Sequence, residues 1–141
     1  MGQINVGGVL KGGLVAGVIM TVSESILNIP VAGERMDAEL KVLNLAPPGN
    51  HAIAIFMGIT LALGILMVWL YAAIRPRFGP GPKTAVCAGL LVWALSYLYG
   101  SISFGVLGIN SWGLITLGVS WTLVECMVAA VAGAYFYKEE A

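Results

Sequence analysis

Four long apolar stretches leave this chain little freedom in how it can fold. They cover about residues 7–29, 52–74, 84–107 and 113–137. Each is long enough to cross the roughly 30 Å core of a bilayer, which takes about 20 residues as a helix. Because a segment in lipid must satisfy its own backbone hydrogen bonds, each stretch is expected to be helical. The predicted fold class is all-α: an integral membrane four-helix bundle formed by residues 1–141 as a single domain.

The composition also indicates a membrane protein. Hydrophobic residues make up 59% of the chain and charged residues only 10%, whereas ordinary soluble domains carry about 25% charged residues. Mean hydropathy is +0.92. The formal net charge is zero, so no basic surface points to a nucleic acid as a partner.

Basic residues are distributed unevenly between the two ends of the predicted helices. One end holds five, which are Lys11, Arg75, Arg77, Lys83 and Lys138. The opposite end holds only Arg35 and Lys41. Because basic residues favour the cytoplasmic side, this asymmetry predicts a multi-pass protein with both termini cytoplasmic. The basic loop 75–83 would then lie at the cytoplasmic face, with Arg75, Arg77 and Lys83 against lipid headgroups.

The connection between the first two apolar stretches is too long for a simple turn. Within it, Met36, Leu40 and Leu43 recur at i, i+4 and i+7. This spacing predicts a short amphipathic helix over about 33–45 on the outer surface, ended by Pro47-Pro48. Two alternatives are open: a lid that packs over the bundle, or a docking surface for a partner.

Two of the apolar stretches carry faces of small and polar residues. In the first, Gly13 and Gly17 form a small-xxx-small pair that lets a neighbouring helix approach closely. Thr21, Glu24 and Asn28 continue the same face at helical spacing. The fourth stretch has a comparable face, made of Gly118, Thr122, Glu125, Ala129 and Gly133. We expect the small residues of both faces to pack between helices.

Glu24 and Glu125 are the strongest indication of function. A carboxylate at the centre of a spanning helix costs roughly 2.5–3.5 kcal/mol, so it rarely faces lipid and often marks a functional site. We predict a polar transport pocket in the bundle, formed by Thr21, Glu24, Asn28, Ser96, Tyr97, Thr122 and Glu125. In one interpretation the glutamates exchange protons or hold a cation during transport. In the other they join helices together, within one chain or across an oligomer.

No pattern in the sequence indicates catalysis, a metal or a cofactor. Cys87 and Cys126 lie in separate apolar stretches without C-x-x-C spacing, so inert packing is expected. His51 is the single histidine. With no nucleotide-binding loop, no paired metal ligands and no nucleophile–base spacing, we predict that the protein is not an enzyme and has no cofactor.

Three segments resemble a group of small bacterial inner-membrane proteins. They are residues 71–85, which read YAAIRPRFGPGPKTA, the early pair Ser23-Glu24, and the late Trp121 with Glu125. The resemblance implies a four-helix protein of the bacterial inner (cytoplasmic) membrane and supplies no activity. Small multidrug transporters are similar in having four helices and an acidic residue in the first. The long outer loop, the second buried glutamate and the charge bias depart from that family, so the chain is not assigned to it.

We expect a small oligomeric transporter or channel that moves protons or cations through its buried glutamates. The alternative is a non-catalytic accessory or scaffold subunit of a larger membrane complex. A third hypothesis, a membrane enzyme acting on a lipid or quinone, would use Tyr97 or Glu125 as an acid. The expected partners are the lipid bilayer and either further copies of the chain or other subunits.

Overall fold

The computed structural model describes residues 3–139, and over that range it consists of helices and short connections without any strand. In chain order the elements are α1 (Val6–Ile26), η1 (Leu27–Val31), α2 (Gly33–Val42), α3 (Asn50–Phe78), α4 (Pro82–Trp93), η2 (Ala94–Leu98), α5 (Tyr99–Val106) and α6 (Trp112–Phe136). The two η elements are single π-helical turns. The predicted all-helical fold is therefore confirmed.

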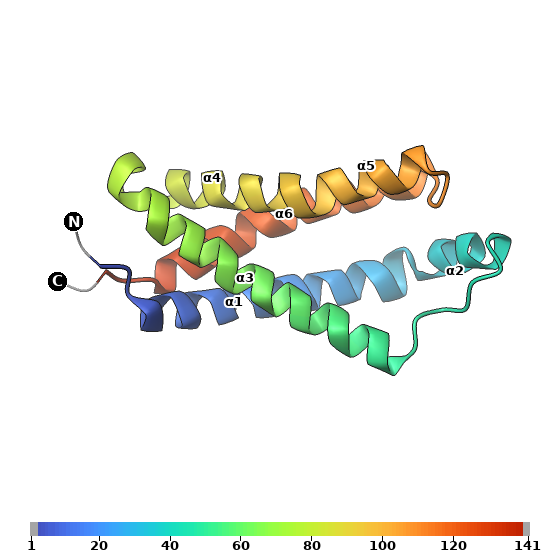
Figure 1. Ribbon diagram of the computed structural model, residues 1–141, viewed down its shortest axis with the longest axis horizontal. Coiled ribbons are helices and arrows are strands. Elements are labelled where there is room, and N and C mark those ends of the chain that lie inside the picture. The colour runs from blue at the N-terminus through green and yellow to red at the C-terminus, as the bar shows by residue number, and fades with distance from the viewer. Residues whose placement is uncertain (1–2, 140–141) are drawn as a thin grey trace.

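Four continuous helical segments are long and apolar enough to cross a membrane. They are Val6–Val31, Asn50–Phe78, Pro82–Val106 and Trp112–Phe136. The start of α1, the α3–α4 loop and the end of α6 lie at one end of the molecule, and α2 and the α5–α6 turn lie at the other (Figure 1). This arrangement is consistent with a multi-pass membrane protein.

Short polar residues and glycines set the ends of the helices. The Asn5 side chain accepts a hydrogen bond from the Gly8 amide at 2.8 Å and caps α1, and Ser111 caps α6 in the same way through Leu114 at 3.3 Å. Such caps satisfy amides that have no partner within the helix. Pro30 lacks an amide donor, and the chain accommodates it in the π turn η1 without ending the helical segment.

The loop predicted over 75–83 is much shorter in the structure. Helix α3 continues through Pro76 to Phe78, so only residues 79–81 connect it to α4. Gly79 and Gly81 have φ values of +84° and +130°, which residues other than glycine rarely adopt. Thr84 donates a hydrogen bond to the Gly79 carbonyl at 2.7 Å and fixes the reversal. Two glycines are therefore sufficient to turn the chain.

Glycines bring α1 into backbone contact with both α3 and α6. A Cβ added at Gly64 of α3 would lie 2.3 Å from the Gly17 amide nitrogen. A Cβ added at Gly12 would lie 2.4 Å from the Gly133 carbonyl oxygen of α6. Since real Cβ atoms do not approach other atoms this closely, only glycine fits where these helices cross. In a bilayer, where lipid is as apolar as leucine, such close packing is a main source of helix association.

The first part of α3 lies apart from the other helices. Figure 1 shows α3 diverging from α1 toward its N-terminal end. All residues from 53 to 59 are exposed, including Phe56 at 60% and Ile59 at 53%. From Thr60 onward the helix alternates between buried and exposed positions. This apolar segment is therefore free to contact lipid or another chain.

We predict that Gly64→Ala destabilises the protein, because its methyl group would force α1 and α3 apart. Overpacking of this kind costs about 1–3 kcal/mol. Gly58→Ala on the same helix is the matched control: nothing lies within 4 Å of a Cβ there, and alanine favours a helix by about 0.5–1 kcal/mol. Denaturant unfolding in mild detergent measures both variants. Equal stability of the two would contradict the packing described here.

Candidate functional site around Glu24 and Glu125

Glu24 lies at the junction of three helical segments. One of its carboxyl oxygens accepts a hydrogen bond from the Thr60 hydroxyl of α3 at 2.8 Å. The other accepts one from the Tyr97 hydroxyl of η2 at 2.5 Å. Both oxygens are therefore engaged, and Glu24 joins α1 to α3 and to the third spanning segment.

Tyr97 reaches Glu24 from the π turn that interrupts the third segment. Turns of this kind insert one extra residue into a helix and are frequent at functional sites. The neighbouring Ser96, predicted to line the same pocket, is exposed. Of this pair, the structure therefore brings Tyr97, and not Ser96, to Glu24.

Two tryptophans make polar contacts between helices. Trp121 of α6 donates its indole N–H to the Ser23 hydroxyl of α1 at 2.9 Å. Trp93 of α4 donates to the backbone carbonyl of Val119 in α6 at 3.1 Å. Because buried indole N–H groups usually need a partner, these bonds fix how α6 sits against α1 and α4.

Glu125 is the polar residue left unsatisfied in this region. Its side chain is only 5% exposed, and neither carboxyl oxygen has a hydrogen-bond partner among the described residues. The Ser23 hydroxyl of α1 lies near this carboxyl group and lines the same groove. Buried polar groups are normally hydrogen-bonded, and an exception calls for an explanation such as a catalytic role, a water or an ion. The two glutamates thus occupy different environments.

A groove between α1 and α6 leads to Glu125. It has a volume of about 400 Å³ and is lined by Ile19, Ser23, Trp121, Val124, Glu125 and Val128. Val124 and Val128 are 63% and 54% exposed, so the groove lies on the outside of the molecule. In a bilayer this outer face would meet the lipid chains.

The remaining predicted pocket residues form no hydrogen bond with either glutamate among the described residues. Thr21 and Thr122 donate to the carbonyls of Gly17 and Gly118, four residues earlier on their own helices. Asn28 lines a separate cavity of about 150 Å³. The seven predicted residues therefore do not form one pocket.

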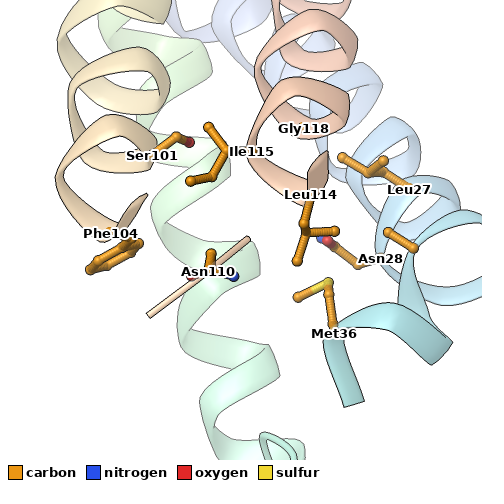
Figure 2. A pocket seen from close by; sticks show the side chains of 10 residues that line it. Leu27, Asn28, Met36, Ser101, Phe104, Asn110, Leu114, Ile115 and Gly118 are labelled. Carbon is orange, nitrogen blue, oxygen red and sulfur yellow. The ribbon is translucent and has the colours of Figure 1, made fainter. Parts of the chain in front are cut away.

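The Asn28 cavity lies at the α2 end of the molecule, between η1, α2, α5 and α6. Figure 2 shows Asn28 and Met36 near Leu114, with Phe104 on the opposite wall. Helix α2 is held over this end by Glu39, which accepts hydrogen bonds from the Ser111 amide at 3.1 Å and from the Ser111 hydroxyl. The α2 segment is thus fastened to the start of α6.

Of the residues predicted to pack between helices, Gly118 is the one that is not packed against a neighbouring helix. Gly13 and Gly17 lie against Ile65 and Leu61 of α3. Gly133 and Ala129 are buried on α6. At Gly118, by contrast, nothing lies within 4 Å of an added Cβ, and the residue lines the Asn28 cavity.

The three basic residues predicted to meet lipid headgroups also differ from one another. Arg75 forms an ion pair with Glu139 at 3.2 Å and its guanidinium lies 5.7 Å from the centre of the Tyr137 ring. Arg77 and Lys83 are exposed. Arg75 therefore ties the end of α3 to the segment after α6, while the other two face outward.

Three residues of the site are not among the seven predicted pocket residues: Thr60, Ser23 and Trp121. Thr60 carried a usable signal, because it is the one hydroxyl-bearing residue between Ala52 and Leu70. A lone hydroxyl in a spanning helix tends to bond a neighbouring helix. Periodicity on a single helix cannot identify which neighbour supplies the partner.

The length and apolar character of its helices are consistent with a multi-pass helical membrane protein. Comparison with known protein families, with curated proteins and with solved structures gives no match to this chain.

We predict that Tyr97→Phe destabilises the protein by about 1–3 kcal/mol, because it removes a hydrogen bond and leaves one oxygen of Glu24 without a donor. Tyr99→Phe is the control, since Tyr99 is 73% exposed. Denaturant unfolding of both variants in the same detergent compares them. A loss of stability in the Tyr99 variant equal to that in the Tyr97 variant would argue against the Glu24 contact.

Proposed function

We propose that this protein is a membrane transporter that moves protons or cations, with Glu125 as the exchanging group. The observation that carries the proposal is a buried carboxyl group whose two oxygens have no hydrogen-bond partner within residues 3–139. A carboxyl group that only joins helices gains its stabilising effect from hydrogen bonds of normal geometry, and Glu125 has none among the described residues, although the Ser23 hydroxyl lies near it. An exchanging group instead needs oxygens that are free for a proton or cation.

Glu24 has a different role in this proposal. Its oxygens are held by Thr60 and Tyr97, so it joins three segments near the exchanging group. The proposal therefore divides the two predicted roles, exchange and helix joining, between the two glutamates.

The proposed setting is a four-helix bundle in the bacterial inner membrane, with both termini cytoplasmic and α2 on the outer surface. The excess of basic residues at the end that holds the termini supports this orientation. The chain is proposed to act as a homo-oligomer, because four helices are few to enclose a pathway. The exposed apolar segment of α3, residues 53–59, offers a surface for a second copy.

The same segment of α3 favours the second candidate, an accessory subunit of a larger membrane complex. Seven consecutive exposed positions, most of them large and apolar, would suit a partner helix as well as lipid. Native mass spectrometry of gently extracted membranes separates the candidates. A homo-oligomer without other subunits supports transport, and a fixed complex with another protein supports the accessory role.

The transport proposal predicts that Glu125→Gln abolishes proton or cation flux in proteoliposomes while the protein still inserts. Glutamine keeps the size of the side chain and removes the group that exchanges. Flux is measured with a pH-sensitive dye after a proton gradient is imposed, and with potassium or sodium gradients in parallel. Glu34→Gln is the matched control, because Glu34 is exposed on α2.

Flux that is unchanged in Glu125→Gln would overturn the transport proposal. Absence of flux in the unsubstituted protein, under proton and cation gradients alike, would also overturn it. Retention of the elution volume in gel filtration shows whether the Glu125 variant is folded.

The proposed orientation predicts that a membrane-impermeant amine reagent applied to bacterial spheroplasts labels Lys41 but not Lys138. Both lysines are exposed in the structure, so a difference in labelling reports the side of the membrane. Breaking the membrane should make Lys138 reactive. Labelling of Lys138 in intact spheroplasts would contradict cytoplasmic termini.

A further inference from the structure

We propose that the groove between α1 and α6 binds a protonated hydrophobic amine, whose ammonium group pairs with the carboxylate of Glu125. This inference rests on the proposed exchanging role of Glu125 and adds the chemical class of its ligand. It is derived from the charge, lining and depth of the groove.

The chain supplies no positive charge of its own to Glu125. Among the described residues, every lysine and arginine lies in the first two turns or the last turn of a spanning helix, in a loop or on α2. A buried carboxylate without a cation or hydrogen bonds is costly, and proteins normally pair such groups. Whenever Glu125 loses its proton, a counter-charge therefore has to come from outside the described residues.

The lining of the groove selects against a divalent metal ion. Metal ions such as Mg²⁺ or Ca²⁺ take about six oxygen ligands or more. The groove offers the oxygens of Ser23 and Glu125, and its other walls are apolar or aromatic. No cluster of three metal-ligating side chains exists among the residues that the structure describes. A cation that brings its own apolar body fits this lining better.

The two unpartnered oxygens select the type of organic cation. Both are acceptors, and an ammonium group donates up to three N–H hydrogen bonds. Charge-assisted hydrogen bonds of this kind are about twice as strong as neutral ones. A quaternary ammonium group has the charge but no N–H to donate. Trp121 at the side of the groove adds an aromatic surface, which attracts cations.

The size of the groove limits the ligand. Its volume of about 400 Å³ lies within the usual range for small-molecule sites, roughly 300–1,000 Å³. It would hold an amine with one aromatic ring or a short alkyl chain.

The depth of Glu125 in the membrane distinguishes a free hydrophobic amine from the amine of a lipid headgroup. At 1.5 Å per residue, Glu125 lies about 20 Å from the start of α6 and about 16 Å from its end. This position is near the centre of the bilayer, whereas the amine of phosphatidylethanolamine lies at the surface. The geometry therefore favours a free hydrophobic amine over a lipid headgroup.

Access to Glu125 requires a movement at the groove. The carboxyl oxygens are buried, and the hydrogen bond from Trp121 to Ser23 joins the α6 wall to the α1 wall at 2.9 Å. Breaking this one bond frees the indole, and the flexible glutamate can then turn toward the groove. Binding should therefore change the environment of Trp121.

The test is binding to the intact protein in nanodiscs, with empty nanodiscs as the blank. Three probes of nearly the same size are compared by calorimetry: 2-phenylethylamine, its N,N,N-trimethyl derivative and 2-phenylethanol. We expect the amine to bind at least about tenfold more tightly than either of the other two. We expect Glu125→Gln to lose this preference, and Glu125→Asp, which keeps the charge, to retain part of it.

Glu34→Gln serves as the matched control and should bind the amine as the unsubstituted protein does. Equal binding of all three probes, or amine binding that survives in Glu125→Gln, would overturn the proposal. Nanodiscs of phosphatidylcholine and of phosphatidylethanolamine are compared in parallel. Amine binding in the first that disappears in the second would assign the groove to the lipid headgroup and overturn the free-amine source.

The binding test and the flux test can each reject one proposal without rejecting the other. Proton or cation flux that depends on Glu125, together with no amine preference, leaves the transport function standing and removes the amine. Amine binding that depends on Glu125, without any flux, supports the site and removes the transport function.

Discussion

The close approach of α1 to α3 and α6 is the constraint on which the rest of the structure depends. Gly12 meets Gly133 and Gly64 meets Gly17 at distances that admit no side chain. Because the backbones nearly touch there, the polar side chains further along α1 come within hydrogen-bond reach of neighbouring helices. Glu24 can meet Thr60, and Ser23 can meet Trp121, only because the helices cross so closely.

The contrast between the two glutamates follows from this packing. α3 and η2 each supply a hydroxyl to Glu24, whereas neither carboxyl oxygen of Glu125 has a hydrogen-bond partner among the described residues, although the Ser23 hydroxyl lies near it. Retaining an unsatisfied carboxyl group costs stability, since removing a partner from a buried polar group costs about 1–3 kcal/mol. Sites that combine such a cost with access from a groove are good candidates for function. This is the physical basis of the proposed exchange at Glu125.

The sequence predicts the helical class because each apolar stretch, once in lipid, must satisfy its own backbone hydrogen bonds, and a helix does so. It also identifies Glu24, Glu125 and Tyr97, because polar groups stand out in apolar segments. It does not predict that Thr60 is the partner of Glu24, since that depends on how α3 crosses α1. Nor does the sequence predict that Asn28 and Gly118 line a separate cavity. The first and last spanning segments diverge toward the α2 end of the molecule (Figure 1), which places these two residues away from the glutamates.

The C-terminal end of α3 is another place where the sequence alone does not predict the structure. The charges and prolines of residues 75–83 indicate a loop, yet α3 continues through Pro76 because a proline removes only one hydrogen bond from a long helix. Similarly, Arg75 is used in an ion pair with Glu139, a partner more than sixty residues away.

The central claim is that Glu125, and not Glu24, is the group that exchanges its proton. Infrared difference spectroscopy of the protein in its lipid film, recorded between acidic and alkaline buffers, measures this directly. The account predicts a protonated-carboxyl band that changes with buffer, is absent in Glu125→Gln and persists in Glu24→Gln. A band that persists in Glu125→Gln and vanishes in Glu24→Gln would contradict it.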